Sequence, residues 1–375
     1  MSRKQSPLEI PELLDLCIGY LASSQGDLLS CALVARRWTG AAQFNLFSAP
    51  MDTVTGMDLF QRDIDSYDRI LRQLYDALAE SPHLVRYVRE LQLGDRTATS
   101  TIKKLCSIPF THLESLTLMM RRLKNYGTAL KSLLGLRTLR YVSLNLDISF
   151  TRCVAHVLPH LSSSIEHLDV CYDQRLPLKP MDALGEGVPM RLKSLGLTVI
   201  VKTITQTPQT LRSLGFYPFD ISGLKAVAVS CLSPIQWDTI PTHTLQVLDI
   251  DPMDEETPLD LSLFPALRNF RIKISPGLPP MVPATVAKVS QCQQLHTMAF
   301  VFWGNDLSDA DCALFDSVIA TSGLDVVQFQ TRARQDETVT LSADRFPRSM
   351  ARNMLQVVAD NREIDRWWQD RVLEL

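Results

Sequence analysis

Apolar residues recur along most of the chain in one short spacing. Windows of six residues carry them at the first, fourth and sixth positions, as in LESLTL at 113–118 and LQVLDI at 245–250. The apolar–polar alternation at the end of each window is typical of a strand that buries one face. Ten such windows occur, at 88–93, 113–118, 139–144, 165–170, 192–197, 211–216, 245–250, 267–272, 295–300 and 324–329.

The segments between the windows indicate helices. The first four intervals are 25 to 27 residues long, and later intervals run from 19 to 34. Helical spacing of apolar residues appears between windows at 127–136, 151–161 and 309–321. A strand–helix unit of this size buries only one face, so neighbouring units must complete its core. The sequence thus predicts an α/β fold, an irregular solenoid with parallel strands on a concave face and helices outside. An ordinary α/β domain is the alternative.

The windows resemble leucine-rich repeats, whose repeat length spans the same range. The resemblance is incomplete, because the Asn that often follows the strand is absent. Arg121, Asp147 and Asp173 stand at the equivalent positions. The turns are therefore expected to be built differently, so regular curvature does not follow. We place this repeat-like region at residues 85–343.

Residues 11–47 predict three short helices. Pro11 suits the first turn of a helix, where its missing N–H is not needed. Apolar residues at helical spacing follow it: Leu13, Leu14, Cys17, Ile18 and Leu21. Asp27 can cap a second helix that runs to Trp38, and 41–47 forms a third. About 40 residues seldom build a self-sufficient core, so this module is expected either to bind a partner or to cap the following domain.

Two stretches of this module, IPELL at 10–14 and DLLSCALVARRW at 27–38, closely resemble the F-box family, and most of all large fungal F-box families. Ile10 and Ala35 are mild departures from the family pattern. The resemblance implies an F-box at residues 8–47 that binds Skp1, a subunit of cullin-based ubiquitin ligases. It also implies which residues form much of the Skp1-facing surface: Ile10, Pro11, Leu13, Leu14, Val34 and Trp38. Trp38 alternatively serves only the internal core.

The remaining boundaries follow from spacing. Residues 1–7 form a tail, and 48–84 form a linker with a connecting helix at 66–80 that Pro82 ends. Residues 344–375 are expected to form a C-terminal helical cap over the last repeat, with helical spacing from Ala351 to Ile364 and a close at Trp367 and Trp368. The alternative for this segment is a docking helix with two Trp anchors.

Composition adds limits on partners and location. The formal net charge is only −3, which argues against general nucleic-acid affinity. No apolar stretch approaches the roughly 18 residues of a membrane span, and the first six residues lack the apolar core of a signal peptide. None of the eight cysteines forms a CxxC pair, and most lie among apolar residues. Buried reduced thiols in a cytoplasmic or nuclear protein are the expectation.

Catalytic patterns are absent from the sequence. It contains no Gly-rich phosphate loop, no HExxH and no nucleophile elbow. Cys153, His156 and His160 have a faintly metal-like spacing, but Pro159 interrupts that turn and the neighbours are apolar. A packed helix explains these residues better than a metal site, so we expect no enzyme activity, metal or cofactor.

A partner surface is expected on the strands instead. The polar positions of the windows should lie exposed on the concave face, together with residues just after them. The candidate partner-binding residues are Tyr141, His167, Asp169, Tyr217, Asp249, Asp251, Asn269, Arg271 and Lys273, with Glu90 on the same face. With the F-box resemblance, this predicts an adaptor that binds Skp1 at one end and a target protein at the other. A non-catalytic scaffold that binds a partner without ubiquitination is the alternative.

Overall fold

A computed structural model describes most of the chain. It covers residues 11–21, 24–48, 64–94, 97–120, 127–146, 157–173, 190–200, 219–220, 222–231, 240–252, 258–274, 281–303, 308–332, 343–358 and 361–375. Two compact units result: unit 1 comprises residues 1–145 and 156–164, and unit 2 comprises 146–155 and 165–375. Each is described by itself.

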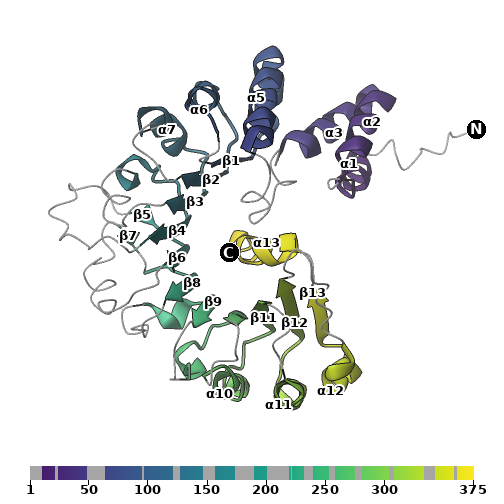
Figure 1. The fold of residues 1–375 in the computed structure, drawn as a ribbon, viewed down its shortest axis with the longest axis vertical. Helices are drawn as coiled ribbons and strands as arrows, with labels where there is room; N and C mark the ends of the chain where they lie inside the picture. Colours follow the sequence, from purple (N-terminus) through teal and green to yellow (C-terminus); the bar gives the residue numbers. More distant parts are fainter. Residues whose placement is uncertain are drawn as a thin grey trace, which may run out of the picture. The chain divides into compact units, whose positions relative to one another are not determined.

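Unit 1 begins with three helices, α1 (Pro11–Gly19), α2 (Gln25–Val34) and α3 (Arg36–Ser48) (Figure 1). Their shared core consists of Leu14, Ile18, Leu28, Ala41 and Ala42. The three predicted helices are therefore present, although two details of the prediction are wrong. Asp27 does not cap α2 but lies in its first turn, because the helix already begins at Gln25. The extended backbone of Ala35 ends α2, so Trp38 belongs to α3.

The rest of unit 1 alternates helices and strands. Its elements are α5 (Ile64–Glu80), η2 (Pro82–Tyr87), β1 (Glu90–Gly94), α6 (Thr99–Cys106), β2 (Ser115–Met120), α7 (Gly127–Leu134), β3 (Tyr141–Leu146) and η4 (Leu158–His160). The strands follow the order β1-β2-β3. β1 and β2 are parallel, with Leu91 opposite Leu116. The predicted connecting helix at 66–80 corresponds to α5, which begins two residues earlier.

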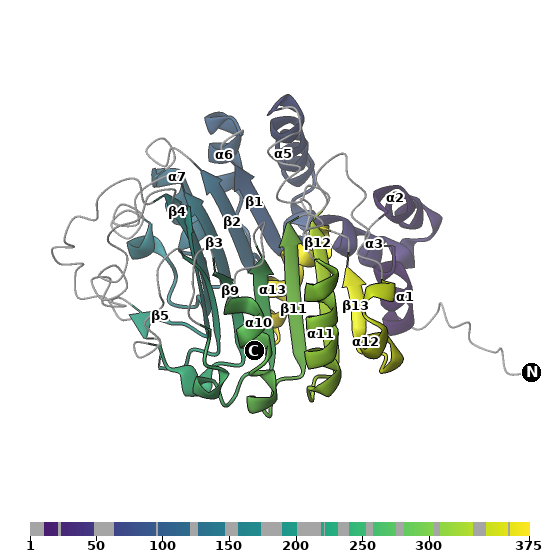
Figure 2. The same ribbon diagram turned by 60° about the horizontal axis from the view of Figure 1, so that its bottom comes forward.

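Unit 2 is built around parallel strands that follow chain order (Figure 2). They are β4 (His167–Asp173), β6 (Ser194–Ile200), β8 (Ala226–Cys231), β9 (Val247–Pro252), β10 (Asn269–Ile274), β11 (Thr297–Trp303), β12 (Val326–Arg332) and β13 (Leu355–Val358). A separate two-stranded sheet pairs β5 (Met190–Arg191) with β7 (Phe219–Asp220). The α/β prediction with a parallel sheet is confirmed at this level.

Helices lie on both faces of the unit 2 sheet. One face is covered by α10 (Met281–Val286), α11 (Asp309–Thr321) and α12 (Pro347–Ala351), and we call it the outer face (Figures 1 and 2). The other face, which we call the inner face, carries α13 (Asn361–Leu373). Short 3-10 turns complete the connections: η6 (Thr242–Thr244), η7 (Leu261–Leu263), η8 (Val289–Gln291) and η9 (Ala343–Arg345).

The fourth position of the sequence windows forms a ladder through the sheet of unit 2. Paired register joins these residues from strand to strand, and all are buried: Leu168, Leu195, Val227, Leu248, Phe270, Met298 and Val327. Val227 belongs to β8, which the window search missed although Leu224, Val227 and Val229 fill its slots. The window at 211–216 lies outside the described residues.

The C-terminal segment departs from its predicted helix. Residues 355–358 form β13, which pairs in parallel with β12. Strand pairing prevails here because the exposed edge of β12 offers backbone hydrogen-bonding groups that a helix would leave unpaired within the protein. Arg352 stands where the windows have an apolar first residue, so the spacing gave no strand signal.

Aromatic residues fill the outer-face core near the last strands. Phe300 of β11 contacts Phe315 of α11 at a centroid distance of 5.1 Å and Phe329 of β12 at 5.4 Å. Phe329 also stacks on Phe346, at 4.4 Å. Ser308 and Asp311 form a reciprocal capping box at the start of α11, so the helix that presents Phe315 has a fixed beginning. Phe329 thus links Phe300 to Phe346 within this core.

Replacing Phe329 with Ala should therefore lower the free energy of unfolding by about 3–5 kcal/mol, because a fully buried ring is removed and a cavity remains. Denaturant midpoints and slopes would measure the loss. Val357→Ala on exposed β13 is the control and should cost less than about 0.5 kcal/mol. Equal effects of the two substitutions would contradict this account of the core.

Candidate protein-interaction surfaces

Exposed apolar side chains concentrate on the three N-terminal helices of unit 1. Among the described residues, twelve large apolar side chains are exposed; six of them belong to α1, α2 and α3, and a seventh, Tyr20, directly follows α1. These are Leu13, Leu16, Tyr20, Leu29, Leu33, Val34 and Phe44. Tyr20 is 81% exposed and Leu33 is 87% exposed. Scattered exposed apolar residues are ordinary, but such a concentration is typical of a surface that a partner covers.

The exposed residues group by helix face. Leu13 and Leu16 lie at helical spacing along α1, with Tyr20 directly after its end, and Leu29 and Leu33 lie at helical spacing along α2. Leu16, Tyr20 and Phe44 also line a hollow of about 690 Å³ together with Tyr87 from η2. We call the seven residues together the N-terminal apolar surface.

The Skp1-contact residues that the sequence predicted include both exposed and buried side chains. Leu13 and Val34 are exposed on the N-terminal apolar surface, whereas Leu14 is 5% exposed and lies in the module's core. The ring of Trp38 is half-buried and packs against that core, and its Nε1 has no hydrogen-bond partner. Pro11 is the first residue of α1, and Ile10 lies outside the described residues.

Sequence reasoning missed several exposed members of this surface. Leu16, Tyr20, Leu29, Leu33 and Phe44 are the residues that the family resemblance did not bring forward. The sequence nevertheless held a signal for them: each is an apolar residue that lies outside the spacing of the buried residues Leu14, Ile18 and Leu28.

The inner face of unit 2 is organised by strand register. One row of laterally paired residues runs Asp169, Gly196, Ala228, Asp249, Arg271, Ala299, Gln328. The preceding row runs His167, Ser194, Ala226, Val247, Asn269, Thr297, Val326. Small residues thus occupy neighbouring positions in both rows: Gly196 and Ala228 in the first row, and Ser194 and Ala226 in the second. We call this part of the inner face, together with Val247 and Ala299, the seat of α13.

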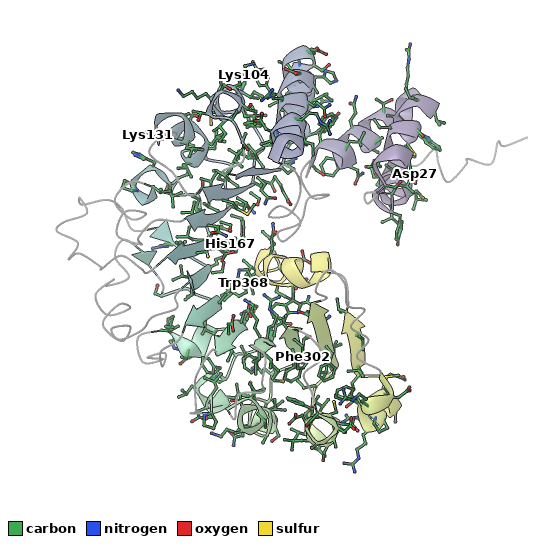
Figure 3. The ribbon with its side chains drawn as sticks, viewed as in Figure 1. Asp27, Lys104, Lys131, His167, Phe302 and Trp368 are labelled. Carbon is green, nitrogen blue, oxygen red and sulfur yellow. The ribbon has the colours of Figure 1, made fainter. Side chains whose placement is uncertain are left out.

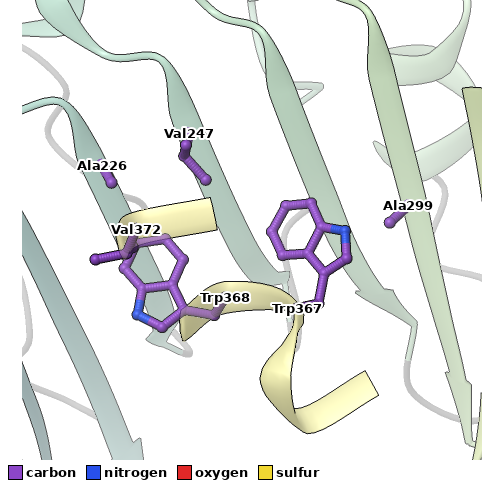
Figure 4. Close-up of a cluster of buried hydrophobic side chains, with 6 residues drawn as sticks. All are labelled: Ala226, Val247, Ala299, Trp367, Trp368 and Val372. Atoms are coloured by element: carbon purple, nitrogen blue, oxygen red, sulfur yellow. The ribbon is translucent and has the colours of Figure 1, made fainter. Parts of the chain in front are cut away.

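Helix α13 fills this seat with two indole rings. Trp367, Trp368 and Val372 pack against Ala226, Val247 and Ala299 (Figure 4). Both rings are almost fully buried, with Trp367 at 5% and Trp368 at 6% exposure. Trp368 extends from α13 toward the strand that carries His167 (Figure 3). The seat is therefore occupied by the chain's own C-terminal helix.

A polar contact fixes each indole. Trp368 Nε1 donates a hydrogen bond to Asp169 Oδ1 at 3.1 Å. The guanidinium of Arg271 lies over the ring of Trp367, 4.6 Å from its centroid, in a cation–π arrangement. Lys225 Nζ additionally donates to the backbone carbonyl oxygen of Leu375 at 3.2 Å. These contacts favour indole rings over other apolar side chains, because one contact needs an N–H donor and the other needs an aromatic face.

Asp249 holds the charged centre of the inner face. Its side chain is 1% exposed, and its Oδ2 lies 2.5 Å from Arg271 Nη2 and 3.1 Å from Lys273 Nζ. Burial alone would raise the pKa of this carboxyl, but the two cations outweigh burial and hold the pKa below its ordinary value. The ionised carboxylate in turn orients Arg271 beneath Trp367.

Gly196 makes room for Asp169. A Cβ at this position would lie 2.1 Å from Asp169 Oδ1, well inside van der Waals contact. The Asp169 carboxylate therefore lies over the backbone of β6, where it accepts the Trp368 hydrogen bond. A glycine inside a strand window is a sequence signal that could have marked this close approach, beside Trp367 and Trp368, which had already suggested a docking helix.

The expectation of a fully exposed row of partner-binding residues is wrong for several positions. In unit 2, Asp249 and Arg271 are buried beneath α13, and His167 is 3% exposed with a hydrogen bond to Ser194. Tyr141 of unit 1 is also buried. The half-buried members of the predicted set are Glu90, Asp169, Asp251, Asn269 and Lys273. Tyr217 lies outside the described residues.

Other site types find no support among the described residues. No group of three or more His, Cys, Asp or Glu side chains there could hold a metal ion. Of the predicted metal-like trio, only His160 is described, since Cys153 and His156 fall outside those ranges. Burial raises the pKa of the Cys106 thiol to about 12, which opposes thiolate chemistry there. Among the described helices, none combines the length and apolar character that crossing a membrane requires.

Comparisons with known proteins do not identify a family for this chain. No protein-family model matches it, and no curated protein matches it. The argument for function therefore depends on the two surfaces themselves.

Gly196→Ala should weaken the α13 contact, because the new methyl group displaces the Asp169 carboxylate and breaks its hydrogen bond to Trp368. We expect a loss of about 0.5–1.5 kcal/mol in unfolding free energy, together with weaker near-ultraviolet circular dichroism from the indoles. Gly223→Ala is the matched control, since no heavy atom lies within 4 Å of its Cβ position. An unchanged Gly196→Ala spectrum would contradict this role of the glycine.

Asp249→Asn should destabilise unit 2 in a pH-dependent way. Because the folded pKa is lowered, the ionised carboxylate contributes fully above its ordinary pKa of 3.8, and this contribution is lost as pH falls through the lowered value. We expect the substitution to cost about 3–5 kcal/mol near neutral pH, since Arg271 loses its buried counter-charge. Urea unfolding of both proteins from about pH 7 to about pH 3 would test this. A difference that stays constant on acidification would refute the assignment.

Proposed function

We propose that this chain is a substrate-recognition adaptor of a Skp1–cullin–F-box type ubiquitin ligase. In this proposal the N-terminal helices form an F-box that binds a Skp1-like subunit. The strand-lined remainder belongs to the irregular leucine-rich-repeat class and binds a target protein. The observation that carries the proposal is the N-terminal apolar surface, which lies on the module whose sequence resembles the F-box.

Burial and exposure within the module support a partner role. Its core residues, such as Leu14, Ile18 and Leu28, already suffice to join the three helices. The seven residues of the N-terminal apolar surface remain exposed to water. In a self-contained domain, large apolar residues of these types are mostly buried. Tyr20 is of a residue type that is enriched among the energetically dominant residues of protein interfaces, and Leu33 adds apolar area that binding would bury. A helical module of this size is more stable with a partner than alone.

The resemblance and the surface agree at two positions. Leu13 and Val34 are both implied as Skp1 contacts and exposed on different helices of the module. Trp38 and Leu14 serve the module's own core instead, so substituting them would test folding rather than binding. We therefore assign the partner contact to the exposed residues and the scaffold role to the buried ones.

In this proposal the chain performs no chemistry itself. Its contribution is proximity: a bound target raises the effective concentration of its lysines near a charged conjugating enzyme held by other subunits. Such ligases act in the cytoplasm and nucleus, which is the location we propose. Neither nucleic acid nor a membrane is required as a partner.

Association with Skp1 tests the proposal directly. The double variant Leu13→Arg, Val34→Arg places charges on exposed positions, so the module should remain folded while Skp1 binding falls on the order of 100-fold. Co-purification and titration with purified Skp1 would measure this. Leu314→Arg on α11 is the matched control and should bind normally, since Leu314 is 43% exposed and Leu13 is 41% exposed.

Two results would refute the adaptor proposal: wild-type protein that does not associate with Skp1, or a double variant that binds as well as wild type. If Skp1 binds but no cullin joins the complex, the protein is a scaffold rather than a ligase adaptor. Adding a cullin to the same titration distinguishes these outcomes.

A further inference from the structure

We propose that the inner face of unit 2 is a helix-binding site, which α13 occupies in place of a partner. The partner would be an amphipathic helix that carries two aromatic residues, at least one with a hydrogen-bond donor. Binding of that helix and release of α13 would be alternative states of one surface. This inference rests on the proposed target-binding role of the strand-lined region, but not on the contact with Skp1.

The contacts beneath α13 are those of a recognition site rather than of a general core. The strand residues Phe300 and Phe329 pack on the outer face. The inner face instead offers Gly196, Ala226 and Ala299, around charged groups that each contact one indole. A hydrogen-bond acceptor at Asp169 and a cation at Arg271 select aromatic rings with a donor, as a peptide-binding groove does.

The inner face can also remain stable when α13 leaves. On the strands, release would expose small or charged residues such as Ala226 and Arg271, which carry little apolar area; the larger apolar area of the contact, that of Trp367 and Trp368, belongs to α13 itself. Asp249 would keep its ion pairs with Arg271 and Lys273, because all three belong to the strands. The fold of the sheet therefore does not require α13 in the way it requires the outer-face aromatic core.

The fit of α13 to its seat is incomplete. Trp367 Nε1 and Arg371 Nε, both on α13, are buried without a hydrogen-bond partner, and Asp249 Oδ1 on the strands is buried in the same condition. Each such group opposes the docked state, because water would satisfy it on release. A partner helix with a donor directed at Asp249 Oδ1 would satisfy the group that α13 leaves unpaired. We therefore expect that a partner helix that pairs with Asp249 Oδ1 can replace α13.

Hydrogen exchange of the wild-type chain tests the release. If α13 detaches locally, amides of residues 361–375 should exchange at least about tenfold faster than those of β9, β10 and β11. The measurement needs no variant and no Skp1. Protection of α13 equal to that of the strands, lost only on global unfolding, would overturn the proposal.

A peptide in trans tests the binding site. The probe is a fluorescent peptide with the sequence of residues 361–375, added to full-length wild type and to full-length Trp367→Ala, Trp368→Ala. The variant, whose own helix is weakened, should bind the peptide at least about tenfold more tightly than wild type. A peptide in which both Trp residues are replaced by Ala should not bind. Adding Asp169→Ala to the variant should weaken binding, and adding Leu314→Arg on the outer face should not.

The possible results separate cleanly. A folded double variant that fails to bind the wild-type peptide would overturn the proposal. So would a double variant that loses cooperative unfolding, because α13 would then be an integral part of unit 2. Peptide binding without Skp1 association would support the helix-binding site and refute the adaptor function. Skp1 association without peptide binding would refute the helix-binding site and leave the adaptor function supported.

Discussion

Lateral pairing between parallel strands is the constraint on which unit 2 depends. Each strand is hydrogen-bonded to the next in chain order, so residues with the same place in successive windows become neighbours. Because side chains alternate between faces, the apolar slots are collected on the outer face and the polar slots on the inner face. A shift of one residue in any strand would exchange these faces. Leu248 and Asp249 show the consequence, since adjacent residues serve opposite faces of the sheet.

The same register brings the charged centre of the inner face together. Asp249 and Arg271 lie opposite each other on β9 and β10, and Lys273 follows two residues later on the same face. None of these charges could be buried alone at acceptable cost, but the triad compensates itself and leaves Arg271 available beneath Trp367. The docking of α13 thus depends on strand pairing, because the register of the strands sets the position of Arg271. Among the described residues of unit 1, no element covers the outward apolar residues of the N-terminal module in this way.

The inner face and the N-terminal apolar surface differ in what a partner must overcome. Tyr20 and Leu33 are already in water, so binding there gains from their burial without first removing another element. Any helix that binds the inner face must compete with a tethered α13, whose effective concentration is high. One surface is therefore suited to constitutive association and the other to selective exchange.

Sequence spacing determined the strands and helices of this protein well, because each window's alternation is a local property. The predicted helix at 309–321 coincides with α11, and most windows lie on the strands that the structure describes. The three helices of the N-terminal module were likewise predicted from local spacing. Only tertiary structure decided that Leu14 is buried while Leu16 is exposed, and that residues 355–358 join the sheet as β13. Tertiary structure alone also brought Trp368 to Asp169, which is 199 residues away in the chain, because no local pattern encodes where a C-terminal helix finds a seat of small residues.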